Sequence, residues 1–155
     1  IGGEFISNNF LFGGEYASIS YDGGGDASCL DIISGFGFSE KAFFTIEYLS
    51  ASSDTEIDYS GMLFGVKGFS DMSQQFFIEG YFALNLLIDG STTLFGKRLS
   101  GDTNIMKYGL KLGFKITENI VATLGYKVQD MSYEDFSGTL DITDSVITIG
   151  ITATF

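Results

Sequence analysis

The sequence of 155 residues contains no histidine, no proline and no tryptophan, and its only cysteine is Cys29. Without histidine, neither a Ser–His nor an Asp–His catalytic arrangement can be built, and zinc lacks one of its usual ligands. One cysteine cannot form an internal disulfide. We therefore expect no enzyme, no metal centre and no cofactor.

Basic residues are also scarce, with 8 Lys and Arg against 20 Asp and Glu. Binding to a phosphate backbone requires a basic surface, so we expect no nucleic-acid partner. The sequence has no run of about 18 apolar residues, which excludes a transmembrane helix. A membrane β-barrel remains open, because its strands are short and alternate in polarity.

What the chain does contain favours β-structure. Glycine (21 residues) and phenylalanine (16 residues) are abundant, and proline does not interrupt them. Eight stretches alternate apolar and polar residues and are bounded by turn-forming residues. These expected strands span 9–21, 27–38, 42–51, 57–69, 75–88, 104–116, 120–131 and 141–155. We expect one all-β domain over 1–155, with residues 1–8 as a short N-terminal segment.

The connections between the expected strands alternate in length. Short turns fall at 39–41, 70–74 and 117–119, and longer loops fall at 22–26, 52–56, 89–103 and 132–140. Short turns on one side and long loops on the other are typical of an up-and-down membrane barrel. An even number of strands would place both chain termini on the side of the short turns.

The two faces of the expected strands differ in a way that distinguishes membrane from soluble barrels. In 104–116, Lys107, Lys111 and Lys115 alternate with glycine on one face, while bulky apolar residues occupy the other. A lipocalin-like soluble barrel, the alternative, would place the apolar face inside. Lysine beside glycine instead suits a crowded polar interior, and bulky apolar side chains suit lipid contact.

Aromatic residues are expected to form two belts, as they do at the two interfaces of a membrane. The belt near the short turns would contain Phe10, Phe12, Phe36, Phe38, Phe43, Phe44, Phe69, Phe76, Phe77, Phe114 and Phe155. The belt toward the long loops would contain Tyr16, Tyr21, Tyr48, Tyr59, Tyr108 and Tyr133.

The last strand carries the most specific signal. Ile149, Ile151 and Phe155 share its apolar face, and the strand resembles the C-terminal sorting strand of Gram-negative outer-membrane barrels. With the Leu11-Phe12-Gly13-Gly14 segment and residues 117–126, the chain resembles the OmpA/OmpX-type family of small outer-membrane barrels.

The resemblance implies an eight-stranded antiparallel up-and-down transmembrane β-barrel in the bacterial outer membrane. Both termini would be periplasmic and the long loops extracellular. Its expected partners are the lipid bilayer, lipopolysaccharide, the barrel-assembly machinery through the C-terminal strand, and an envelope protein.

Strand facing brings nine charged residues together as an expected lumen network. Its members are Glu15, Asp31, Glu47, Lys67, Glu79, Lys107, Lys111, Lys115 and Lys127. Buried charges are stable only when paired or hydrated. The network therefore predicts a lumen closed by salt bridges, or alternatively a narrow pore lined by the lysine row. Cys29 is expected to fill space near this lumen.

A second charged set lies in or beside the long loops. It contains Asp22, Asp26, Asp54, Glu56, Asp58, Asp89, Asp102, Asp130, Glu134, Asp135, Asp141 and Asp144. Only Lys97 and Arg98 oppose these acids in the loops. The set is read as a solvated acidic surface, with Ca²⁺ or Mg²⁺ binding as the alternative. We expect a structural anchor that displays acidic loops for envelope integrity or surface interaction; a pore or a subunit of a larger envelope complex are the alternatives.

Overall fold

The computed structural model describes the backbone of residues 2–7, 9–20, 26–53, 58–87, 89–94, 97–117, 120–135 and 138–153. It describes the side chains of residues 2–6, 9–18, 27–52, 59–85, 104–117, 120–132, 139, 141 and 143–151. Within these residues the fold is all-β, and no helix is long and apolar enough to cross a membrane.

The described chain forms ten strands. In order they are β1 (Gly2–Ser7), β2 (Phe10–Ser20), β3 (Asp26–Ser39), β4 (Ala42–Ser53), β5 (Asp58–Asp71), β6 (Phe76–Leu87), β7 (Asp89–Leu94), β8 (Lys97–Lys115), β9 (Ile120–Asp135) and β10 (Gly138–Ala153). The alternation of apolar and small or polar residues explains their extended form, because side chains of a strand point alternately to its two faces.

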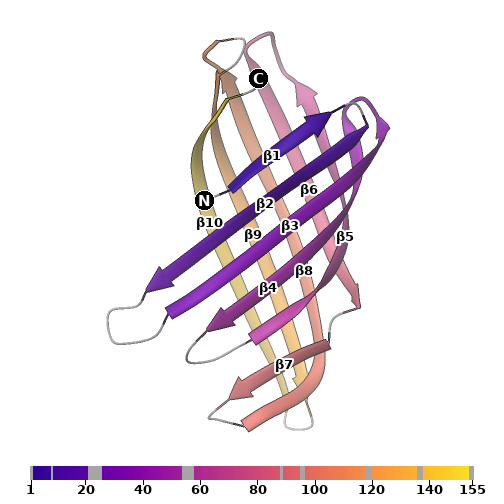
Figure 1. The fold of residues 1–155 in the computed structure, drawn as a ribbon, viewed down its shortest axis with the longest axis vertical. Coiled ribbons are helices and arrows are strands. Elements are labelled where there is room, and N and C mark those ends of the chain that lie inside the picture. The colour runs from indigo at the N-terminus through magenta and orange to yellow at the C-terminus, as the bar shows by residue number, and fades with distance from the viewer. Residues whose placement is uncertain are drawn as a thin grey trace.

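The strands form one antiparallel up-and-down sheet with the order β1-β2-β3-β4-β5-β6-β8-β9-β10. β7 lies off this path, where it forms a hairpin with the first residues of β8 and also pairs with β5. Figure 1 shows this hairpin at one end of the sheet. The short turns that join β3 to β4 and β5 to β6 lie at the opposite end.

All eight segments expected from the sequence form strands, and the described chain adds two strands to them. Residues 2–7 pair with β2 instead of forming a segment outside the strands, and 89–94 form β7 inside an expected loop. Gly2 lies beside Glu15, so β1 begins halfway along β2. β10 reaches the short-turn end, where Ala153 lies beside Ile120.

The sheet is curled into a half-barrel. In Figure 1, β2, β3 and β4 cross in front of β8, β9 and β10. Ion pairs join strands that are far apart in the sheet order, since Lys107 on β8 contacts Asp31 on β3 and Glu47 on β4. Among the described residues, no pairing joins β1 to β10, so the two edges of the sheet remain separate.

Apolar side chains also occupy the concave inner face, which the sequence pattern did not predict. One cluster, toward the long loops, consists of Leu49, Leu63, Ala83, Ile105 and Met131. Cys29, Tyr59 and Tyr81 pack against this cluster, which agrees with the filling role expected of Cys29. Toward the short turns, Leu11 and Phe43 are almost fully buried. The interior is therefore apolar at both ends and charged between them.

Candidate functional site

The charged interior is centred on Lys107, which is 1% exposed. Its Nζ donates a hydrogen bond of 2.5 Å to Asp31 Oδ2 and another to Glu47 Oε1. The Tyr81 hydroxyl donates a hydrogen bond to the other carboxylate oxygen of Glu47. A buried ammonium group thus holds together acids from two strands on the opposite wall.

Lys127 on β9 extends this central cluster toward β2. Its Nζ lies 2.8 Å from Glu15 Oε2 and 3.7 Å from Asp31 Oδ2. In the central cluster three carboxyl groups, from Glu15, Asp31 and Glu47, share two ammonium groups. The hydroxyl of Tyr81 supplies a further donor, which helps to satisfy the excess of acceptor atoms.

A second cluster lies one step closer to the short turns. Glu79 Oε1 lies 2.9 Å from Lys67 Nζ and 2.8 Å from Lys111 Nζ. Lys67 also forms an ion pair with Glu4, which reaches the interior from β1. Two acids and two bases balance here. Lys67 and Glu79 are buried, so the pairing offsets the cost of removing both charges from water.

The third lysine of the row on β8 behaves differently, because it lies at the rim. The Lys115 side chain is 43% exposed and its Nζ is 3.8 Å from Asp71 Oδ1. Asp71 has a closer partner in the β3–β4 turn, since Lys41 Nζ lies 2.7 Å from Asp71 Oδ2. This hydrogen bond and the charge of Lys41 hold the pKa of Asp71 below its usual value.

The outer face of the sheet has the opposite character. Large apolar side chains stand exposed along its length, although most proteins keep such groups in a core. The exposed set includes Phe12, Leu30, Ile32, Phe36, Phe44, Ile46, Val66, Phe76, Phe82, Leu84, Leu110, Leu112, Leu124, Ile147, Ile149 and Ile151. A contiguous apolar surface of this extent is typical of contact with lipid or another protein.

The expected aromatic belts are present only in part. Phe10 packs edge-on against Phe36, and Phe76 packs against Phe114, with all four rings exposed. Phe12, Phe38, Phe44, Tyr16, Tyr48 and Tyr108 are exposed as well. The remaining expected members fall into two groups.

Four expected members of the belts lie on the inner face of the sheet instead. Phe43 is buried in the interior and packs against Phe69, and the Phe77 ring lies over inner-facing Gly113. The Tyr59 hydroxyl accepts a hydrogen bond from Gln129 inside. Phe43 and Phe77 are each adjacent in sequence to an exposed Phe, and successive side chains of a strand point to opposite faces. The belts were predicted from position along the strands and took no account of this alternation. Phe155 and the side chains of Tyr21 and Tyr133 lie outside the described residues.

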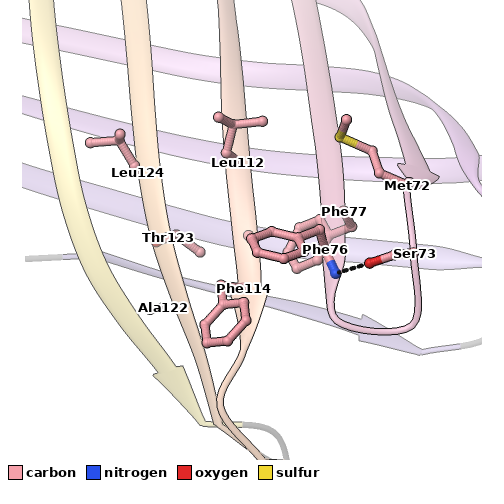
Figure 2. Close-up of a pocket in the computed structure, with 10 residues that line it drawn as sticks. Met72, Ser73, Phe76, Phe77, Leu112, Phe114, Ala122, Thr123 and Leu124 are labelled. Atoms are coloured by element: carbon pink, nitrogen blue, oxygen red, sulfur yellow. Dashed lines mark hydrogen bonds between the residues drawn. The ribbon is translucent and has the colours of Figure 1, made fainter.

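A hollow of about 510 Å³ opens where β6, β8 and β9 approach the short turns. Figure 2 shows its lining, which includes the exposed side chains of Phe76, Leu112, Phe114 and Leu124. The Ser73 hydroxyl accepts a hydrogen bond of 3.1 Å from the Phe76 amide at its edge. The lining contains no ionisable side chain, so the hollow offers no group for acid–base chemistry.

Eight of the nine residues expected in the lumen network form ion pairs in the interior, and Lys115 forms its contact at the rim. The outward facing expected of the last strand holds for Ile149 and Ile151, which are 85% and 77% exposed. Of the acidic loop set, only the side chains of Asp130, Asp141 and Asp144 are described. The others, with Lys97 and Arg98, have side chains outside the described part. No group of metal-ligating residues occurs among the described side chains.

The predicted interior network was limited to charged residues of the expected strands, so it did not include Glu4, Tyr59, Tyr81 or Gln129. Alternation does place Tyr81 on the strand face of Glu79 and Gln129 on that of Lys127, and the structure shows that these polar side chains join the network. Glu4 carried no such signal, because residues 1–8 had no predicted strand.

Comparison of the chain with protein-family models, with curated proteins and with solved structures found no match.

Proposed function

We propose that this chain is a transmembrane β-barrel of a bacterial outer membrane. It acts as a non-conducting anchor that displays acidic loops on the cell surface and contributes to the integrity of the envelope. The observation that carries this proposal is the inverted distribution of polarity. The described lysines of the inner face are paired with acids, whereas the outer face exposes Phe, Ile and Leu.

A soluble protein with this outer face would expose far more apolar surface than water tolerates. A bilayer removes this difficulty, since lipid chains solvate apolar side chains and the charged groups remain paired inside. The hollow near Phe114 adds to this reading, because its apolar lining would accept a lipid acyl chain.

The filled interior favours an anchor over a pore. The cluster of Leu49, Leu63, Ala83, Ile105 and Met131 crosses the inner face next to the central charge cluster. An eight-stranded barrel is just wide enough for its own side chains to fill it. A conducting path would have to pass both the apolar cluster and the ion pairs of Lys107.

Refolding into phospholipid vesicles tests the proposal. We expect the full chain to float with the vesicles and to run at different positions on a gel before and after boiling. Planar bilayers should show no reproducible channel events. Protein that stays in solution and shows no heat-dependent shift would refute the membrane location, and steady unitary currents would favour the pore.

Gentle extraction of the native protein tests the remaining alternative. An anchor should be recovered without associated proteins. A defined set of co-purifying envelope proteins would instead favour a subunit of a larger complex.

A further inference from the structure

The two edges of the curled sheet carry an inference that rests on the proposed function. β10 is sixteen residues long, and among the described residues no strand pairs with its outer edge. In the hydrocarbon region of a bilayer, every backbone N–H and C=O group must be hydrogen-bonded within the protein. A membrane-embedded form must therefore close this edge.

The strand at the other edge obstructs the simplest closure. β1 pairs with β2 from Ser7↔Phe10 to Gly2↔Glu15, so it occupies the edge of β2 that would face β10 in a closed barrel. β1 and β10 both run toward the short turns. Closing the sheet with β1 in place would therefore require a parallel pair of at most six residues.

The register of the sheet shows where β10 would meet β2 if β1 were absent. Residue-by-residue pairing leads from Leu11 on β2 through Gly35, Thr45, Gly65, Ala83, Lys107 and Gln129 to Asp144 on β10. Closing a sheet into a barrel requires a fixed stagger between its two edges, and in the eight-stranded TIM barrel this stagger is about eight residues. We apply the same stagger here. Asp144 would then lie beside Ile19, and Ile151 beside Phe12.

This register fits both the lengths and the faces of the two strands. Phe10, the first residue of β2, would pair with Ala153, the last residue of β10, so every residue of β2 would find a partner. The outward residues Phe12 and Ile151 would share a face. β10 would thus pair with the same six residues of β2 that now pair with β1, and its antiparallel ladder with β2 would be eleven residues long.

We infer that β1 is a displaceable edge strand. It covers β2 while the sheet is open, and β10 replaces it when the barrel closes in the membrane. The ion pair between Glu4 on β1 and Lys67 on the inner face of the sheet holds β1 in place. Its release leaves no orphaned lysine, because Lys67 keeps Glu79 at 2.9 Å.

Disulfide trapping in the full chain tests this exchange, with Cys29→Ser as the background. Phe5→Cys with Phe12→Cys reports the β1–β2 pair, and Phe12→Cys with Ile151→Cys reports the closed seam. All three side chains are exposed, so neither pair disrupts the interior. Ile149→Cys and Ala153→Cys, each with Phe12→Cys, detect a register shifted by two residues.

In lipid-free protein we expect the Phe5–Phe12 pair to form the disulfide. In vesicle-inserted, heat-modifiable protein, we expect the Phe12–Ile151 pair or one of its shifted neighbours to replace it. Inserted protein that still traps Phe5 with Phe12 and never traps Phe12 with β10 would overturn the inference alone. Disulfide-linked dimers through Ile151→Cys would overturn it in favour of a second copy. Protein that never inserts would overturn the proposed function and the inference together.

Glu4→Gln provides a second readout. We add Glu4→Gln to each cysteine pair and supply too little lipid for all of the protein to insert. Removing the charge of Glu4 should raise the yield of the Phe12–Ile151 disulfide relative to that of the Phe5–Phe12 disulfide several-fold. Glu40→Gln is the matched control, since it removes the same charge from the exposed β3–β4 turn and should leave the ratio unchanged. Equal ratios for Glu4→Gln and the background protein would show that the ion pair of Glu4 does not hold β1 in place.

Discussion

The inner face of the sheet buries charged side chains, whereas the outer face of the same strands exposes apolar ones. On β8, Lys107 is buried and bonded to two acids, while three residues away Leu110 is 56% exposed. On β4, Glu47 is buried, while its neighbours in sequence, Ile46 and Tyr48, are exposed. A sheet of this kind cannot gain its stability by hiding apolar groups from water on its outer face. Its internal contacts are polar pairs and small apolar layers.

This difference shows what kind of surroundings the sequence fits. Under the proposed function, the inner face pairs its charged groups within the protein, and the outer face contacts the apolar chains of the bilayer. Substitutions at matched inner and outer positions therefore test the comparison directly.

Lys107→Met should have the largest effect. It removes the ammonium group that Asp31 and Glu47 share, so Glu47 loses this ion pair and Asp31 keeps only Lys127 at 3.7 Å. We expect the free energy of unfolding in vesicles, measured by urea titration, to fall by about 3–5 kcal/mol. Lys115→Met is the control at the exposed rim and should change it little. Equal losses for the two variants would contradict the buried network.

Leu110→Arg tests the outer face of the same strand. An arginine facing lipid near the middle of a bilayer costs about 2–4 kcal/mol. Urea titration in vesicles should therefore show a loss of that size, while protein studied without lipid should tolerate the change. A variant as stable in vesicles as the parent would mean that Leu110 does not face lipid.

Gly65→Ala should have an intermediate effect on the inner face. A Cβ at Gly65 would collide with the backbone carbonyl of Phe82 and lie 2.9 Å from Thr45 Oγ1. Overpacking of this kind typically costs about 1–3 kcal/mol. At Gly80 on the next strand, a Cβ meets nothing within 4 Å, so Gly80→Ala should be neutral or slightly stabilising. Thermal unfolding of the pair measures the difference.

Thr45→Val should have the smallest effect and the opposite sign. Thr45 is 2% exposed, and among the described side chains only its Oγ1 is buried without a hydrogen-bond partner. Replacing an unsatisfied hydroxyl with a methyl group should change the free energy of unfolding by no more than about 1 kcal/mol, in the stabilising direction. A large loss in urea titration would reveal a partner for this hydroxyl.

The sequence predicted much of this fold because alternation marks both a strand and its two faces. It located all eight expected strands, and eight of the nine charged residues that it assigned to the interior form ion pairs there. It missed β1 because Gly2–Ser7 is only six residues long. Within it, Glu4 stands between glycines and apolar residues, so no clear alternation of polarity appears. It missed β7 because Gly-Ser-Thr-Thr reads as a loop until it pairs with the start of β8.

The layering of the interior could not be predicted from one strand at a time. Leu49, Leu63 and Met131 meet because the sheet curls and its register aligns distant strands. Likewise, nothing in the lysine spacing shows that Lys107 is buried while Lys115 reaches the rim. Those differences depend on the level of each residue along the tilted strands.

The most direct test of the account is the environment of Leu110 in vesicle-inserted protein. A nitroxide label at Leu110→Cys, in the Cys29→Ser background, should collide often with oxygen and rarely with a water-soluble nickel chelate. A label at Lys41→Cys in the exposed turn should show the reverse. If nickel reaches Leu110 as readily as Lys41, the outer face does not contact lipid and the central claim is wrong.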